Sequence, residues 1–260
     1  MTPTTGKSDR PRSGGRLLWH LALSLLALAA VLAVFERTDL DLWVQDRCFD
    51  FSTGQWVVNK SDDLLRWAFY IGPKVALVVG GIACAAVYAL SFKDRRLCPW
   101  RRGCLLMVLS LAAVPSSVMG IKELANVYMP CQNQRYGGDK PYVKMLQRYP
   151  PDYPNSWGKR GRGWPASHAS GGLSLLMLYF AARKRKWKVL GLSAGLAAGW
   201  IMGLYQTVNG QHYLSHTFVS MILAWMIVVL LNHGVEAMAR SPNPTSADSF
   251  VSPYSALKRL

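Results

Sequence analysis

Long apolar runs constrain this chain more than any other feature of its sequence. Six such runs stand between polar segments, at about 17–35, 68–92, 104–121, 167–182, 189–205 and 214–231. A helix needs about 20 apolar residues to cross the hydrocarbon core of a bilayer. The runs therefore predict an all-α fold, a polytopic membrane bundle with six transmembrane helices. The run at 167–182 is short, and its length suits a buried core helix nearly as well.

The positions of the basic residues predict how the chain is threaded. Lys and Arg number 30 against 14 Asp and Glu, a formal net charge of +16. Such an excess can indicate a nucleic-acid partner, but here the charges gather in the N-terminal tail and in the loops 93–102 and 183–188. Short loops rich in Lys and Arg face the cytoplasm, and six crossings put all three on one side. We therefore expect a lipid bilayer and no nucleic acid as partner, with both termini cytoplasmic.

The expected organisation is a cytoplasmic tail at 1–16, a membrane domain at 17–233 and a second, disordered tail at 234–260. The first run has the basic flank of a signal peptide, but it is longer than the roughly 7–15 apolar residues of such segments, so we prefer an uncleaved helix. The fifth run carries glycine at every fourth position from Gly191 to Gly203. This spacing forms a smooth helix face that another helix can approach closely, within one chain or between chains, so the oligomeric state stays open.

Two long segments fall on the opposite, outer side of the predicted bundle. Residues 36–66 have the character of an amphipathic cover, with Trp43, Phe49 and Trp56 among acidic residues. Residues 122–165 are basic on the side where few cations are expected, and long structured loops are often functional. An anion site is the preferred explanation, and attraction to acidic lipid headgroups is the alternative. The cations are Lys122, Arg135, Lys140, Lys144, Arg148, Lys159, Arg160 and Arg162.

The five cysteines show no spacing typical of a metal site. Cys48 and Cys131 would both lie outside, where a disulfide is permitted. Two unpaired thiols are an equally good interpretation.

Three of the five histidines fall at the outer boundary. His168 opens the fourth run, while His212 and His216 stand where the fifth run turns into the sixth. Runs four and six both begin there, so their free N–H groups and positive dipole ends face the same side as Lys122. Imidazoles, a lysine and N–H donors suit the binding of a phosphate and the cleavage of its ester. The alternative is a metal or haem site with the three histidines as ligands.

The order of these residues resembles the type 2 phosphatidic acid phosphatase (PAP2) superfamily, the family of bacterial membrane lipid phosphate phosphatases. That family has the patterns K-x6-R-P, P-S-G-H and S-R-x5-H-x3-D. The corresponding residues here are Lys122 with Met129-Pro130, then Pro165-Ala166-Ser167-His168, then Tyr205-Gln206 with His212 and His216. The resemblance covers about 104–231. Met129, Gln206 and His216 depart from it, because the family has two arginines and an aspartate there.

The resemblance implies a phosphotransfer in two steps that needs no metal or other cofactor. His212 would attack the phosphorus and form a phosphohistidine. His168 would protonate the leaving oxygen and then activate a water molecule. His216, which replaces the aspartate, would accept a hydrogen bond from His212.

The resemblance also implies a phosphate-binding set and a substrate class. Lys122 and Ser167 would hold the phosphate, and Arg135, Lys159 or Arg162 would supply the charge of the absent arginines. The expected activity is removal of a phosphate, on the periplasmic face, from a lipid phosphate or pyrophosphate of the phosphatidic acid, phosphatidylglycerol phosphate, undecaprenyl pyrophosphate or lipid A type. The alternatives are a lipid-to-lipid phosphotransferase with the same site and a lipid-binding protein whose chemistry is impaired.

Overall fold

Five long helices dominate the computed structural model, which describes residues 13–147, 149 and 161–240. They are α1 (Ser13–Arg37), α4 (Gly72–Leu90), α5 (Arg101–Ala125), α8 (Arg185–Val208) and α9 (Leu214–Met238). With the short helical segments that precede α4 and α5, these make five segments long and apolar enough to cross a membrane. The chain is therefore a multi-pass membrane protein, and the expected all-α architecture is confirmed.

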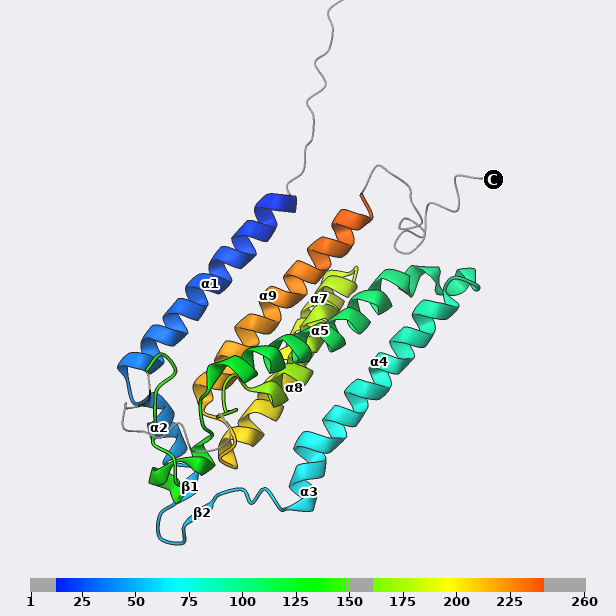
Figure 1. Ribbon diagram of the computed structural model, residues 1–260. Coiled ribbons are helices and arrows are strands. Elements are labelled where there is room, and N and C mark those ends of the chain that lie inside the picture. The colour runs from blue at the N-terminus through cyan, green and yellow to red at the C-terminus, as the bar shows by residue number, and fades with distance from the viewer. Residues whose placement is uncertain (1–12, 148, 150–160, 241–260) are drawn as a thin grey trace, which may run out of the picture.

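The fourth expected span is not one continuous α-helix. It consists of α6 (Ser167–Leu173), the 3-10 turn η5 (Ser174–Met177) and α7 (Leu178–Ala181). This segment is shorter than a full bilayer crossing requires, so the structure supports five spans and leaves the sixth open. Leu173 and Leu176 are at most 1% exposed, as a core helix requires. The start of α1 and the end of α9 lie at the same end of the bundle (Figure 1).

The glycine stripe of α8 lets this broken segment pack closely. A Cβ added to Gly195 would lie 2.6 Å from the backbone nitrogen of Leu176, and one added to Gly199 would lie 2.4 Å from the side chain of Leu173. The other two members, Gly191 and Gly203, have equally close neighbours. The predicted close helix contact is confirmed, and it lies within a single chain.

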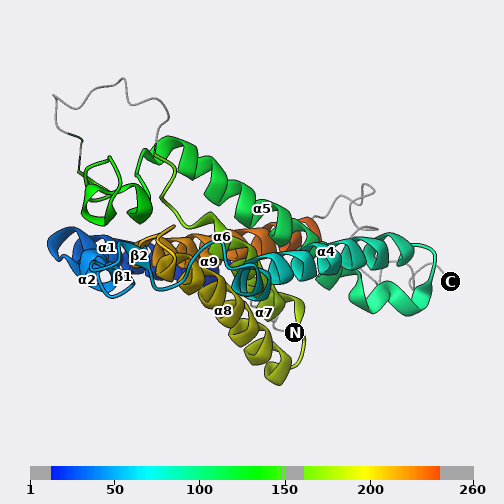
Figure 2. The same ribbon diagram turned by 90° about the horizontal axis from the view of Figure 1, so that it is seen from below.

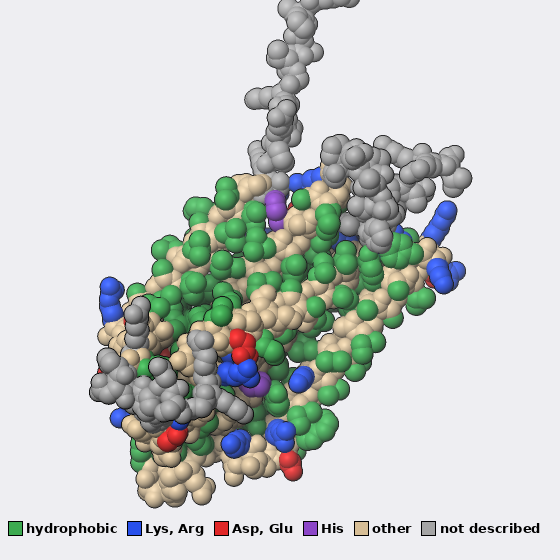
Figure 3. Space-filling view, viewed as in Figure 1, with side chains coloured by type: hydrophobic (Ala, Val, Ile, Leu, Met, Phe, Trp, Pro, Cys, Tyr) green, Lys and Arg blue, Asp and Glu red, His purple; other side chains and the backbone are tan. Residues whose placement is uncertain are grey.

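The core lies where α5, α6, η5 and α9 meet. It contains Leu106 and Val114 of α5, Leu173 of α6 and Val228 of α9. Seen from below, α5 and α8 lie on opposite sides of α9 (Figure 2). None of the residues of α4 is buried, so this helix is peripheral. Hydrophobic side chains cover the middle of the visible face and charged side chains gather towards its ends (Figure 3), as a surface that crosses a bilayer requires.

The outer segments form a cover over one end of the bundle. The first contains α2 (Leu40–Gln45), the hairpin β1 (Phe49–Asp50) and β2 (Gln55–Trp56), α3 (Asp63–Arg66) and the π-helical turn η1 (Trp67–Ile71). The second contains the 3-10 turns η3 (Pro130–Gln132) and η4 (Gln134–Tyr136), and η2 (Arg95–Trp100) lies at the other end, before α5. Phe49 packs on Trp56 and Tyr136 with ring centroids 4.9 and 5.3 Å away. Gln45 donates to the carbonyl of Thr207 at 2.8 Å. The expected cover is thus confirmed.

The helices extend beyond the predicted membrane domain of 17–233, because α1 begins at Ser13 and α9 ends at Met238. Of the two expected tails, residues 1–12 and 241–260 lie outside the described part of the chain. Cys48 and Cys131 are free thiols. Cys131 accepts a hydrogen bond from the side chain of Gln211 at 3.4 Å, so the unpaired interpretation holds.

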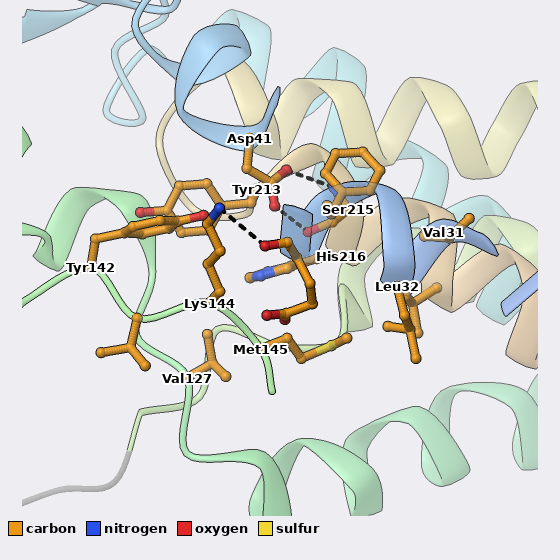
Figure 4. A pocket seen from close by; sticks show the side chains of 14 residues that line it. Val31, Leu32, Asp41, Val127, Tyr142, Lys144, Met145, Tyr213, Ser215 and His216 are labelled. Carbon is orange, nitrogen blue, oxygen red and sulfur yellow. Dashed lines mark hydrogen bonds between the residues drawn. The ribbon is translucent and has the colours of Figure 1, made fainter. Parts of the chain in front are cut away.

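Asp41 of α2 caps the N-terminus of α9. Its carboxylate accepts hydrogen bonds from the backbone N–H of Ser215 at 2.9 Å and from its hydroxyl at 2.5 Å (Figure 4). Burial raises the pKa of Asp41 from 3.8 to about 6. The sequence predicted free N–H groups at this helix end, but a carboxylate of the chain itself already occupies it.

Replacement of Asp41 with asparagine will raise stability more at pH 7 than at pH 4.5. A carboxyl group whose pKa is raised in the folded state contributes stability that is complete below pH 3.8 and is lost as the pH rises through about 6, a difference of up to about 3 kcal/mol. The side-chain oxygen of asparagine can still accept the hydrogen bond from the backbone N–H of Ser215. Asparagine has no charge, so its burial carries no penalty for removing a charge from water. Thermal unfolding in detergent at both pH values measures this, and an equal Tm difference at both would contradict it.

Candidate active site

A tight turn between α8 and α9 carries His212. The backbone carbonyl of Gln206 accepts hydrogen bonds from the N–H of Gln211 at 2.8 Å and of His212 at 3.1 Å. Gly210 has a φ of 74°, which glycine adopts without strain, and a Cβ there would lie 2.4 Å from the ring of Trp56. The turn holds His212 in the interior, where only 1% of it is exposed.

One nitrogen of His212 is bonded and the other is free. Nδ1 lies 2.7 Å from the carbonyl oxygen of Gly163. A carbonyl oxygen only accepts, so Nδ1 carries the proton and Nε2 holds the lone pair. Nε2 is buried and has no hydrogen-bond partner among the described residues. Burial above all holds the pKa of His212 well below 6.5, so the ring is neutral at pH 7, the form in which histidine is a nucleophile.

The position of Gly163 depends on the segment that follows α5. The helix ends at Asn126 in the left-handed conformation, with φ 48°. The Asn126 side chain accepts from the N–H of Gly161 at 2.8 Å, and the N–H of Gly163 donates to Val127 at 2.5 Å. A Cβ on Gly163 would lie 2.7 Å from the carbonyl oxygen of Tyr128. Only glycine fits here, and the pair of glycines before the P-A-S-H segment was the sequence signal for this backbone contact.

The structure brings four of the predicted site residues together. His168, the second residue of α6, has its ring centroid 5.5 Å from that of His212. Lys122, in the last turn of α5, donates to the hydroxyl of Ser167 at 3.2 Å. Lys122 forms no ion pair with a carboxylate in the described ranges. A cation, a hydroxyl and two imidazoles from three segments of the chain therefore share one site.

His216 lies beside His212 but does not orient it. The ring centroids are 5.8 Å apart, and Nδ1 of His216 is buried without a hydrogen-bond partner in the described part of the chain. Together with Asp41, His216 lines a separate pocket near α1 (Figure 4), whereas Lys122 and His168 do not line it. The acceptor role predicted for His216 belongs to the Gly163 carbonyl, because that oxygen already holds the proton of Nδ1.

Replacement of His216 with asparagine will lower the rate of phosphate release by less than about tenfold. An orienting or proton-transferring group typically contributes about 100-fold or more, and the bond that orients His212 remains intact in this variant. The measurement is kcat on a lipid phosphate beside that of His212→Ala. A loss as deep as that of His212→Ala would show that His216 takes part directly.

The three cations expected to supply the charge of the missing arginines have different surroundings. Arg135 of η4 forms two 2.7 Å hydrogen bonds with Asp46 in the outer cover, so its charge is already neutralised and we withdraw it from the phosphate site. Arg162 forms a 2.5 Å ion pair with Glu123, the residue after Lys122. Its charge therefore lies near Lys122 but is paired with a carboxylate. Lys159 lies outside the described residues.

The sequence model of the PAP2 superfamily matches residues 103–239, more than half of the 260-residue chain. The chain belongs to the PAP2 superfamily. Members of the PAP2 superfamily are typically phosphatases. The matched region runs from the start of α5 to the end of α9 and so contains Lys122, His168 and His212. No curated protein and no solved structure matches the chain.

The placement of the side chains bears on the alternative of a metal or haem site with the three histidines as ligands. In the part of the chain that the structure describes, no group of three or more His, Cys, Asp or Glu side chains is placed to hold a metal ion. The geometry instead leaves the Nε2 lone pair of His212 free, as nucleophilic attack requires.

Proposed function

We propose that this PAP2 protein is an integral membrane phosphatase that removes a phosphate from a lipid phosphate or pyrophosphate through a phosphohistidine. The observation that carries the proposal is the state of His212. Its Nδ1 proton is held by Gly163, while the buried Nε2 has no partner within the described residues. A buried polar atom without a hydrogen bond calls for an explanation, and a nucleophile that awaits its substrate provides one.

The first step transfers the phosphoryl group to the protein. Nε2 of His212 attacks the phosphorus, the bond from phosphorus to the leaving oxygen breaks, and His168 donates a proton to that oxygen. The imidazole gains positive charge as the N–P bond forms, and the Gly163 carbonyl dipole at Nδ1 stabilises that charge. Lys122 and Ser167 bind the non-bridging oxygens, where negative charge is concentrated.

The second step releases inorganic phosphate. His168, now neutral, takes a proton from water as the water oxygen attacks the phosphorus. The N–P bond breaks and its electron pair returns to Nε2 of His212. One imidazole serves as acid and then as base. Burial lowers the pKa of His168 to about 4, so the first step needs the negative charge of the bound phosphate to favour the protonated ring.

The surroundings favour an amphiphilic substrate. Lys122 lies in the last turn of a membrane-spanning helix, and the neighbouring α4 exposes apolar side chains such as Val75 and Val78 along its length. Candidate substrates are phosphatidic acid, phosphatidylglycerol phosphate, undecaprenyl pyrophosphate and the phosphates of lipid A. We place the reaction at the periplasmic face of a bacterial-type inner membrane, because the basic loops mark the opposite side as cytoplasmic.

The test is release of inorganic phosphate from these lipids by purified protein in detergent, with a chelator present. We expect turnover by the wild type and none by His212→Ala. Equal release by the two proteins would overturn the assignment. Label from a radioactive donor that appears in an added acceptor lipid instead of in phosphate would favour the phosphotransferase, and binding without turnover would favour the impaired lipid binder.

A further inference from the structure

A π-helical turn stands beside the proposed site, outside the region that the PAP2 model matches. Residues Trp67–Ile71 form η1, and the N–H of Gly72 bonds to the carbonyl of Trp67 five residues earlier. A Cβ on Gly72 would lie 2.7 Å from that carbonyl oxygen, so the turn depends on glycine. Such turns are rare and occur frequently at functional sites.

This turn places one side chain against His168 and a second one next to the first. Tyr70 packs edge-to-face on His168 with ring centroids 4.9 Å apart. Lys74 follows one turn later on the same helix face, with its ammonium 5.9 Å from the centroid of the Tyr70 ring. His168 therefore contacts both the His212 ring and the Tyr70 ring, on which Lys74 lies.

Lys74 is an exposed cation for which the described residues offer no ion-pair partner. Its ammonium lies on the Tyr70 ring that packs against His168, whereas Lys122 donates to Ser167, the residue before His168. The two lysines thus occupy different places: Lys122 contacts the phosphate-binding Ser167, and Lys74 is next to Tyr70, which contacts the proposed acid His168.

We infer that Tyr70 and Lys74 bind the leaving group and that the substrate is a lipid diphosphate. This inference rests on the proposed function. Attack by His212 on the terminal phosphorus breaks the bond to the bridging oxygen, and His168 protonates that oxygen. The departing lipid monophosphate is an anion, which Lys74 neutralises. A phosphate monoester instead releases a neutral alcohol, which offers Lys74 no charge to bind.

The course of α4 agrees with a lipid tail on this side. Lys74 stands in the first turn of α4, and the exposed apolar side chains that follow it include Val75, Val78, Val79 and Ile82. A tail attached to a phosphate at Lys74 can lie along this helix in the hydrocarbon layer, where its burial is favourable.

The test compares two ligands that share one tail and differ by one phosphate. Equilibrium binding of farnesyl diphosphate and farnesyl monophosphate is measured on the full-length His212→Ala protein in detergent, with and without Lys74→Gln. We expect Lys74→Gln to weaken diphosphate binding by about tenfold or more, as loss of a charge-assisted contact does, and monophosphate binding by less than threefold. Lys74→Arg keeps the charge and should retain most of the affinity.

Lys60→Gln is the matched control, because it removes an equally exposed outer cation from the loop before α3. Equal weakening of both ligands by Lys74→Gln, no weakening, or the same effect from Lys60→Gln would overturn the inference. Turnover plays no part in this measurement. Absence of phosphate release by the wild type would therefore count against the proposed function, and an unchanged diphosphate preference would count against the role of Lys74.

Discussion

Replacement of His212 with alanine will lower kcat for phosphate release by about a thousandfold or more, a loss typical of a removed catalytic nucleophile. The buried Nε2 of this ring has no partner in the described chain, and the neighbouring His168 packs against Tyr70 and is assigned the role of the acid. The measurement is single-turnover release from a lipid phosphate in detergent, in which product release does not limit the rate.

His233→Ala is the control for this prediction. His233 lies near the far end of α9, the helix that begins two residues after His212, so the substitution removes an imidazole from α9 without touching the reaction. We expect wild-type rates from it. A His212→Ala protein that keeps more than about a tenth of the wild-type rate would mean that another group attacks the phosphorus.

Replacement of Gly163 with alanine will lower kcat by about a hundredfold or more, although the altered side chain makes no contact with substrate. The new methyl group would lie 2.7 Å from the carbonyl oxygen of Tyr128 and 2.8 Å from that of Val127. The backbone around residue 163 must shift to relieve this contact, and the carbonyl of that residue then moves away from Nδ1 of His212. Without this acceptor, the proton of His212 is no longer fixed on Nδ1 and the ring is no longer held in one orientation. Small displacements of a reacting group lower the reaction rate strongly.

Gly120→Ala is the matched control, since a Cβ at Gly120 has no neighbour within 4 Å and the residue lies one half-turn before Lys122 on α5. It should leave both the rate and Tm close to wild type. Nitrogen NMR of the imidazoles separates the orienting role from a general loss of structure: Gly163→Ala should change the tautomer of His212 while the protein remains folded. An unchanged tautomer together with an unchanged rate would refute the role of the Gly163 carbonyl.

Local patterns in the sequence were enough to predict the helices and the central residues of the site. The apolar runs are properties of consecutive residues, and five of them form the expected membrane helices. Lys122, Ser167, His168 and His212 were found because their spacing follows a family pattern. The structure brings them together from α5, α6 and the turn before α9.

The remaining features depend on contacts that sequence spacing does not encode. The acceptor for His212 is a main-chain carbonyl, which every residue type possesses, so the two glycines at 161 and 163 indicate a close backbone contact but not the bond to His212. The partner of Arg135 is Asp46, 89 residues away, and the break between α6 and α7 lies where α8 packs against them. Tyr70 and Lys74 stand outside the family pattern altogether.

The structure also explains two of the departures from the family pattern, those at Gln206 and His216. Gln206 stands where the family has an arginine, yet the turn that carries His212 is intact because its hydrogen bonds use the backbone carbonyl of residue 206. His216 stands where the family has an aspartate, and the Gly163 carbonyl takes over the orienting bond. Main-chain hydrogen bonds thus hold the proposed nucleophile in place.

Trapping of the phosphorylated protein tests the central claim most directly. Wild-type protein is mixed with a lipid substrate labelled in its terminal phosphate, the reaction is quenched in alkali within the first turnover, and the labelled peptide is identified. We predict an alkali-stable, acid-labile label on His212 that is absent from His212→Ala. Release of phosphate by the wild type with no labelled protein, or with the label on any other residue, would contradict the account.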